Sequence, residues 1–141
     1  MLNSFIEDTD AHKSGVWVHI PDDEMSFRLR RTGTPEANAA LVNIKRHLFG
    51  IDYSEITLTE EQQQQANVYW LCDWVITDWN DVRMSEDDDF IPYSKQNCIA
   101  NLFNNKGTWE SLCPYLLMRS RDYSIFLKKL LEEDKQDAKK P

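Results

Sequence analysis

The feature that most constrains the fold is an apolar, tryptophan-rich segment in the middle of the chain, residues 66–79. Apolar side chains occupy nearly every side of a helical wheel drawn over it, namely Val68, Tyr69, Trp70, Leu71, Trp74, Val75, Ile76 and Trp79. A helix with so little polar surface is buried on several sides. Each tryptophan can bury roughly 150–250 Å². The segment therefore predicts a central helix on which the other elements pack, with Trp70, Trp74, Trp79 and the later Tyr93 as structural core residues.

Local signals predict where this helix begins and ends. Thr59 followed by Gln62 has the form of a capping box, in which each side chain bonds the other residue's backbone N–H. The end is expected near residues 79–82, before the acidic loop Ser85–Asp89. Asp73 and Asp78 lie on the same segment. Because a buried carboxylate needs a partner, we expect them to pair with arginines of the cluster at positions 28, 30 and 31.

Two short stretches near the N-terminus predict a β-hairpin. Residues 16–20 are β-branched and aromatic, residues 25–30 alternate apolar with polar, and Pro21–Glu24 has the composition of a turn. The side chains expected to face inward are Val16, Val18, Ile20, Met25, Phe27 and Leu29. An isolated hairpin is marginally stable in water, so this one must pack on helices or pair with another chain.

Capping signals predict the remaining helices. Thr34 and Pro35 open a helix that ends at Gly50, and Ser94 opens a short one that reaches residue 103. Pro114 predicts a break, after which the last helix covers residues 115–131. The predicted fold class is α+β and mostly α-helical, with an N-terminal β-hairpin packed on a bundle of about four helices around the central tryptophan-rich helix.

Length and charge limit the organisation of the chain. The 141 residues, 41% of them hydrophobic, are enough for one domain, expected at residues 15–131 between a flexible N-terminus, 1–14, and a flexible charged tail, 132–141. The net charge of −8 disfavours nucleic-acid binding. Because there is no signal peptide and no apolar run of about 20 residues, we expect a soluble, intracellular protein.

Residues that could carry chemistry lack the spacing that chemistry requires. Cys72, Cys98 and Cys113 are odd in number and far apart, which predicts core thiols in a reducing compartment. The acidic run 86–89 has no glycine for a calcium loop, the three histidines are scattered, and the four glycines are isolated. We therefore predict no catalytic residues, no metal, no cofactor and no enzyme activity.

The last predicted helix carries a broad apolar stripe, made of Leu116, Tyr123, Phe126, Leu127 and Leu130. Ordinary core packing accounts for such a stripe, because large exposed apolar patches are uncommon on monomers. The functional interpretation is a face that binds an apolar helix of a partner.

Three segments together resemble the tail assembly chaperones of long-tailed, siphovirus-type bacteriophages. Residues 15–18 with 27–33 are similar to the N-terminal hairpin common in that family. Residues 75–82, which contain Asp78-Trp79, are similar to the end of its helix before a short acidic loop, and residues 91–97 resemble the Pro-Tyr-Ser segment that opens its next helix. The resemblance extends from about residue 15 to residue 126. Relatives often have an Asp-Gly turn in the acidic loop, where this chain has no glycine.

The resemblance implies a function. Such chaperones bind the long, apolar, helical tape-measure protein, keep it soluble while the tail tube assembles, and are absent from the mature virion. Many are made in two forms by a translational frameshift, and the longer form helps to recruit tail tube subunits. The implied partners are thus the tape-measure protein and the tail tube protein, with self-association as a further expectation. The implied location is the cytoplasm of the infected bacterial host.

The alternative prediction belongs to another class of protein. Net charge −8 and the acids between Asp78 and Asp89 suit a small inhibitor that mimics nucleic acid and blocks a host defence enzyme. Mimicry requires the acids to be spaced along one exposed face. Here many of them cluster in a single loop. We therefore place this alternative second.

Overall fold

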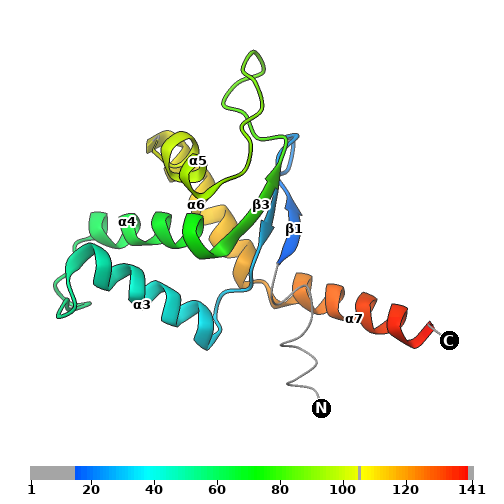
Figure 1. The fold of residues 1–141 in the computed structure, drawn as a ribbon, viewed down its shortest axis with the longest axis horizontal. Coiled ribbons are helices and arrows are strands. Elements are labelled where there is room, and N and C mark those ends of the chain that lie inside the picture. The colour runs from blue at the N-terminus through cyan, green and yellow to red at the C-terminus, as the bar shows by residue number, and fades with distance from the viewer. Residues whose placement is uncertain (1–14, 105, 140–141) are drawn as a thin grey trace.

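The computed structural model describes residues 15–104 and 106–139 (Figure 1). The predicted class, α+β and mostly α-helical, is confirmed. The elements in chain order are β1 (Val16–His19), β2 (Ser26–Leu29), α3 (Pro35–Phe49), α4 (Glu60–Trp70), the π-helical turn η1 (Leu71–Val75), β3 (Ile76–Asn80), α5 (Lys95–Asn97), the π-helical turn η2 (Cys98–Leu102), α6 (Lys106–Arg121) and α7 (Tyr123–Lys139). The predicted flexible N-terminus, residues 1–14, lies outside the described residues.

The N-terminal hairpin forms as the alternation predicts. Strands β1 and β2 pair antiparallel, with Val18 opposite Phe27. The connecting turn is closed by the Ile20 N–H, which donates to the Met25 carbonyl at 2.9 Å. The side chains of Val18, Phe27 and Leu29 are fully buried. The inward face therefore packs on the body of the molecule.

The predicted central helix is wrong in its second half. The helix α4 ends at Trp70, and after the single π-helical turn η1 the chain becomes strand β3, which pairs antiparallel with β2. The β-branched pair Ile76-Thr77 and the aromatic Trp79 favour a strand. Pairing with β2 also gives the marginal hairpin a third strand. The apolar residues of the segment are buried either way, so the hydrophobic pattern alone did not distinguish the two structures.

Helices α3 and α4 form an antiparallel pair at one end of the molecule (Figure 1). The Thr34 hydroxyl accepts a hydrogen bond from the Ala37 N–H and caps α3, which ends at Gly50. Both halves of the predicted capping box at Thr59 and Gln62 are present at the start of α4. The Trp70 Nε1–H donates to the Ala37 carbonyl at 3.1 Å and fastens α4 to α3.

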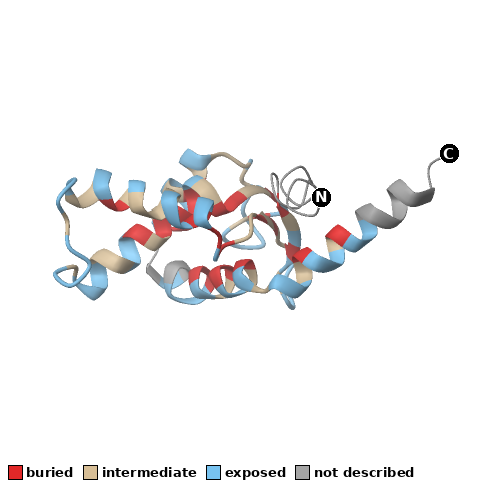
Figure 2. Ribbon diagram, turned by 90° about the horizontal axis from the view of Figure 1, so that it is seen from below, coloured by how far each residue is buried: buried red, intermediate tan, exposed pale blue. Residues whose placement is uncertain are grey.

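The break in the last helical region is at Asp122 and not at Pro114. Helix α6 continues through Pro114. A proline has no N–H to donate within a helix, yet α6 runs on without interruption on both sides of this residue. The Asp122 carboxylate accepts hydrogen bonds from the N–H and the hydroxyl of Ser124, at 3.0 and 2.6 Å, and so caps α7. Helix α7 continues to Lys139 through most of the predicted flexible tail, and it extends away from the body (Figures 1 and 2).

The core lies between the sheet, η1 and the helices α6 and α3 (Figure 2). Trp79 is 4% exposed and its Nε1–H donates to the Ile91 carbonyl at 2.7 Å. The Thr32 N–H donates to the Ser120 carbonyl, and the two buried hydroxyls bond each other at 2.9 Å. These contacts tie the segment after β2 to the end of α6, so that the hairpin and the last helices form one unit.

Candidate functional site

An open groove of about 1190 Å³ lies between α4 and α6. Its apolar surface comes from Phe103, Cys113, Pro114, Leu117 and Met118. Its polar rim comes from Thr59, Glu60, Glu61, Gln64, Asn67, Asn104, Glu110 and Arg121. Three carboxylates against one guanidinium give the rim a negative charge. We call this feature the α4–α6 groove.

Two helices position the groove residues. The capping box at Thr59 fixes the first turn of α4, where Glu60 and Glu61 also oppose the positive end of the helix dipole. On α6, Leu117 is buried, whereas the neighbouring Met118 is 58% exposed at the mouth of the groove. Methionine is flexible and polarisable, so it adapts to apolar surfaces of different shape. The groove therefore combines an apolar, adaptable wall with an acidic rim.

A second apolar surface lies along the protruding helix α7. Tyr123, Leu127 and Leu131 are spaced four residues apart and are 43%, 39% and 54% exposed. Residues at i, i+4 and i+8 share one face of a helix. The Arg31 guanidinium lies over the Tyr123 ring at 4.4 Å from its centroid, so the tyrosine is held at the base of the helix. We call this row the α7 stripe.

The five residues predicted to bind a partner do not form one surface. Leu116 is fully buried and belongs to the main core, while Phe126 and Leu130 are 2% and 8% exposed. Only Tyr123 and Leu127 are exposed. The helical break at Asp122 separates Leu116 from the other four, which the predicted single helix had placed on one stripe. In this conformation, Leu116, Phe126 and Leu130 are structural residues.

Sequence reasoning missed Met118, Glu60, Glu61 and Leu131. The two glutamates lie between Thr59 and Gln62 of the predicted capping box, which gave them no binding role, and Met118 lies outside the predicted stripe. A signal for Leu131 was present, since it continues the four-residue spacing of Tyr123 and Leu127. The groove itself joins segments about 50 residues apart, so no local pattern could have predicted it.

The four aromatic residues predicted as core lie together near β3. Trp70 is 3% exposed, and Trp74 is partly buried beneath the Arg30 guanidinium, 5.1 Å from the ring centroid. Tyr93 is partly buried, its ring packs edge-to-face on Trp79 at 5.2 Å, and its hydroxyl donates to the Ile76 carbonyl at 3.0 Å. These side chains position the strand and the helix pair, and none of them lines the groove.

The two aspartates predicted to be buried beside arginines have different surroundings. The Asp73 side chain is 57% exposed and lies 3.4 Å from the Lys95 ammonium. Asp78 is partly buried, is directly opposite Arg28 in the β2–β3 register, and accepts a hydrogen bond from the Trp79 N–H at 2.8 Å. The prediction for Asp73 is wrong, because its side chain lies on the exposed side of the π-helical turn η1. An arginine is adjacent only to Asp78.

The cysteines are buried and free. Burial raises the pKa of the Cys72 thiol far above its ordinary value and that of Cys113 to about 12. A thiol that stays protonated is a poor nucleophile and a poor metal ligand. Within the described part of the chain, no group of three or more His, Cys, Asp or Glu side chains is arranged to hold a metal ion.

The acidic loop 85–89 is exposed. The Arg83 guanidinium holds its base, where Nε donates to the Glu24 carboxylate at 2.6 Å and Nη1 to the Glu86 carbonyl at 3.0 Å. The carboxylates of residues 86–89 are grouped in this one loop and are not spaced along a face. The acidic-inhibitor alternative stays a prediction.

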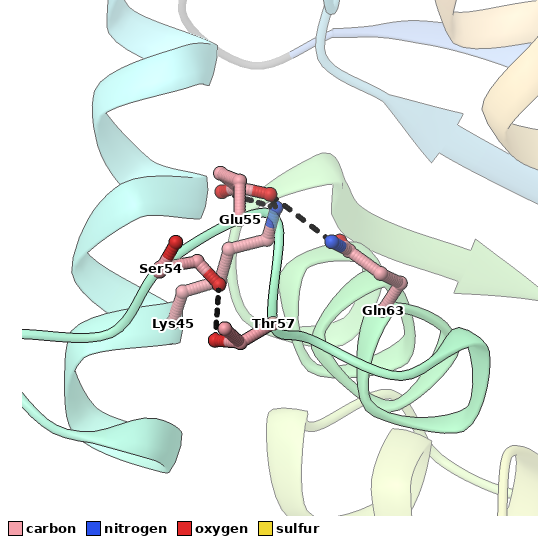
Figure 3. Close-up of polar contacts among 5 residues, drawn as sticks. All are labelled: Lys45, Ser54, Glu55, Thr57 and Gln63. Carbon is pink, nitrogen blue, oxygen red and sulfur yellow. Dashed lines mark hydrogen bonds and ion pairs between the residues drawn. The ribbon is translucent and has the colours of Figure 1, made fainter.

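The loop between α3 and α4 carries two exposed isoleucines and is held to both helices by polar contacts. Lys45 is 6% exposed, and its ammonium donates to both Glu55 carboxylate oxygens at 2.9 and 3.1 Å (Figure 3). Gln63 from α4 donates to the same carboxylate at 3.0 Å (Figure 3). Ile51 and Ile56 are 77% and 95% exposed on this loop. Neither isoleucine lines the α4–α6 groove, so a substitution at Ile56 can serve as a control for substitutions in the groove.

Acid should remove the support of this loop. The hydrogen bonds from Gln63 and Lys45 lower the pKa of Glu55 below its ordinary value of 4.5. Folding lowers the pKa of this carboxyl group. The ionised group therefore stabilises the folded protein fully at pH values above the pKa that it has in the unfolded chain. This stabilisation is lost as the pH falls through the lower pKa that it has in the folded protein. We expect Glu55→Gln to lower the melting temperature at about pH 7, and the difference from wild type to shrink once the pH is below about 4.5.

Thermal melts of wild type and variant across this pH range measure the effect. Asp52→Asn on the same loop is the matched control, because it removes a carboxylate without changing the Lys45–Glu55–Gln63 network. A difference between wild type and Glu55→Gln that does not depend on pH would contradict the prediction.

No family model matches the sequence, and neither a curated protein nor a solved structure matches it. Among the described residues, none of the helices is long and apolar enough to span a membrane.

Proposed function

We propose that the protein is a phage tail assembly chaperone, a binding protein and not an enzyme, which holds apolar helical segments of the tape-measure protein in the α4–α6 groove. In this role it keeps the tape-measure protein soluble, helps to recruit tail tube subunits, and is absent from the mature virion. The observation that carries the proposal is the apolar groove with its acidic rim. The resemblance of the three sequence segments supplies the identity of the partner.

The groove suits an amphipathic helix. A helix that lies in an apolar groove buries side chains at i, i+3, i+4 and i+7. Met118 and Pro114, both exposed, supply the apolar contact, and Met118 can adjust to successive segments that differ in sequence. Such tolerance suits a chaperone, which must bind many segments of one long partner and must later release them.

Charge contributes selectivity and solubility. The carboxylates of Glu60, Glu61 and Glu110 favour helices that carry Lys or Arg beside their apolar face. The net charge of −8 keeps a complex with an apolar partner dispersed by repulsion between copies. The protein thus combines an apolar contact surface with an otherwise strongly charged surface. A chaperone that keeps an apolar partner soluble requires both.

Co-expression with the tape-measure protein encoded in the same genome tests the proposal. The tape-measure protein should become soluble and elute with the chaperone. Met118→Asp places a charge at the mouth of the groove and should reduce the co-purifying tape-measure protein by about tenfold or more, because desolvating that carboxylate against an apolar helix costs well over the 1.4 kcal/mol that a factor of ten represents.

Ile56→Asp is the matched control, since it makes the same change at a residue that is 95% exposed and outside the groove lining. It should leave the yield unchanged. An insoluble tape-measure protein with wild type would overturn the proposed function. Equal losses with both variants, or with neither, would overturn the assignment to the groove.

A further inference from the structure

Two buried cysteines from separate helical turns lie against each other in the core. Cys72 belongs to η1 and Cys98 to η2, and both are free and fully buried. We propose that Cys72 and Cys98 form a redox-sensitive pair, which closes to a disulfide when the chain meets a small-molecule disulfide as oxidant. The proposal goes beyond the proposed function, because neither the bond nor its test involves the tape-measure protein.

Contacts on either side of the pair hold the two turns together. Asp73 directly follows Cys72, and its carboxylate lies 3.4 Å from the Lys95 ammonium at the start of α5. Cys98 comes three residues after Lys95, which places it about one helical turn further along. The Tyr93 hydroxyl donates to the carbonyl of the first residue of β3 at 3.0 Å. The segment 93–98 is therefore fastened beside η1 at two points.

The two thiols are in contact within this frame. The Cys72 and Cys98 side chains share a hydrogen bond. A disulfide requires β carbons about 3.5–4.5 Å apart, and thiols that already touch are placed for this bond. Cys113 on α6 is buried near Cys72 as well, so the same core holds a third thiol from another helix for comparison.

Burial decides when the bond forms. Inside the folded core the thiols stay protonated, whereas attack on a disulfide requires a thiolate. The pair therefore reacts before folding is complete, or when the segment 94–102 opens locally. Helix α5 has three residues and η2 has five, so this segment has little helical structure of its own to keep it closed.

The reaction is a thiol–disulfide exchange in two steps. One cysteine thiolate attacks a sulfur of the small disulfide, forms a mixed disulfide and releases one small thiolate. The thiolate of the other cysteine then attacks the protein sulfur of this mixed disulfide and releases the second small thiolate. Two electrons pass from the cysteine pair to the oxidant, and the two protons lost by the cysteines convert the small thiolates to thiols.

The bond joins positions about 26 residues apart in the sequence. The turn η1 continues α4, and η2 leads directly to Phe103 and Asn104, which line the α4–α6 groove. The disulfide thus fastens one part of the groove lining to the helix that carries another part. Because it also restricts the unfolded chain, we expect it to raise the melting temperature by about 5 °C or more.

Refolding of the full chain from urea, in a buffer with reduced and oxidised glutathione, tests the inference while both thiols are accessible. Alkylation followed by mass spectrometry should find one free thiol of the three in wild type, and a peptide that links Cys72 to Cys98. Cys113→Ala should form the same bond and keep no free thiol. Cys98→Ala should form no internal disulfide. Circular dichroism checks that each variant is folded.

The peptide map of wild type decides the result even if a variant fails to fold. A refolded wild type that keeps three free thiols, or that links Cys113 to either of the others, would overturn the proposal. Thermal melts of the oxidised and reduced forms give a second readout. An oxidised form that melts no higher than the reduced form would also overturn it, because the folded core would then not accommodate the bond.

Discussion

Replacing Trp79 by alanine is expected to reduce the free energy of unfolding by about 3–5 kcal/mol. The side chain is 4% exposed, and its ring packs edge-to-face on Phe27 at 6.1 Å and on Tyr93 at 5.2 Å. Its Nε1–H donates to the Ile91 carbonyl at 2.7 Å. Truncation to alanine removes these contacts together and leaves a cavity beside the sheet. It also removes the hydrogen-bond donor of the Ile91 carbonyl, so that β2, β3 and residues 91–93 lose the side chain that they all contact.

Urea unfolding monitored by circular dichroism measures this loss. Trp17→Ala is the matched control, because Trp17 is 42% exposed on β1 and its removal should cost less than about 1 kcal/mol. If both variants unfold at the same urea concentration, Trp79 is not the buried anchor of β3.

Replacing Gly15 by alanine is expected to destabilise the hairpin by a similar amount. Gly15 has φ +100°, and a Cβ there would lie 2.3 Å from the Leu29 carbonyl oxygen. The left-handed conformation alone costs a non-glycine residue about 1–3 kcal/mol. The overlap with backbone atoms adds to this cost, because the carbonyl of a buried strand residue cannot move without disturbing the pairing of β1 with β2.

Gly33→Ala separates the two contributions. Gly33 also has a positive φ, +78°, but a Cβ there meets no atom within 4 Å. It should therefore cost about 1–3 kcal/mol from conformation alone. Denaturant unfolding of the two variants should rank Gly15→Ala clearly below Gly33→Ala in stability, and equal stability would show that the hairpin end relaxes freely.

The sequence predicted the local structure well where short-range chemistry determines it. The cap at Thr34, the capping box at Thr59 and the hairpin alternation depend on residues within a few positions of one another, and the structure contains all three. Burial was also readable, because Trp70 and Trp79 lie in a segment that is apolar along most of its length, and both are buried.

The element that contains Trp79 was not predictable in this way. Residues 71–80 satisfy a buried helix and a buried strand equally well, and the choice depends on β2, which lies about 50 residues earlier and offers an open edge. Pro114 is a second example. Its conflict with a helix is a local signal, yet α6 continues through it, and the helical region is interrupted at Asp122, whose carboxylate caps α7.

The candidate site was the least predictable part. An apolar stripe on the last helix predicted a binding face, but the break at Asp122 places Leu116 in the core and leaves Tyr123 and Leu127 outside. The groove arises only when α4 and α6 come together. The sequence could therefore predict a mostly helical, acidic protein with more apolar side chains than its core needs. It could not predict which of these side chains are exposed in the folded protein.

The most direct test of the central claim is site-specific photo-crosslinking in cells that co-express the chain and the tape-measure protein. A photoreactive residue at position 118 lies in the groove, and one at position 56 lies on the tip between α3 and α4. We expect covalent adducts with the tape-measure protein from position 118 and none from position 56. Adducts from position 56 alone, or none from position 118 while the two proteins still co-purify, would contradict binding in the α4–α6 groove.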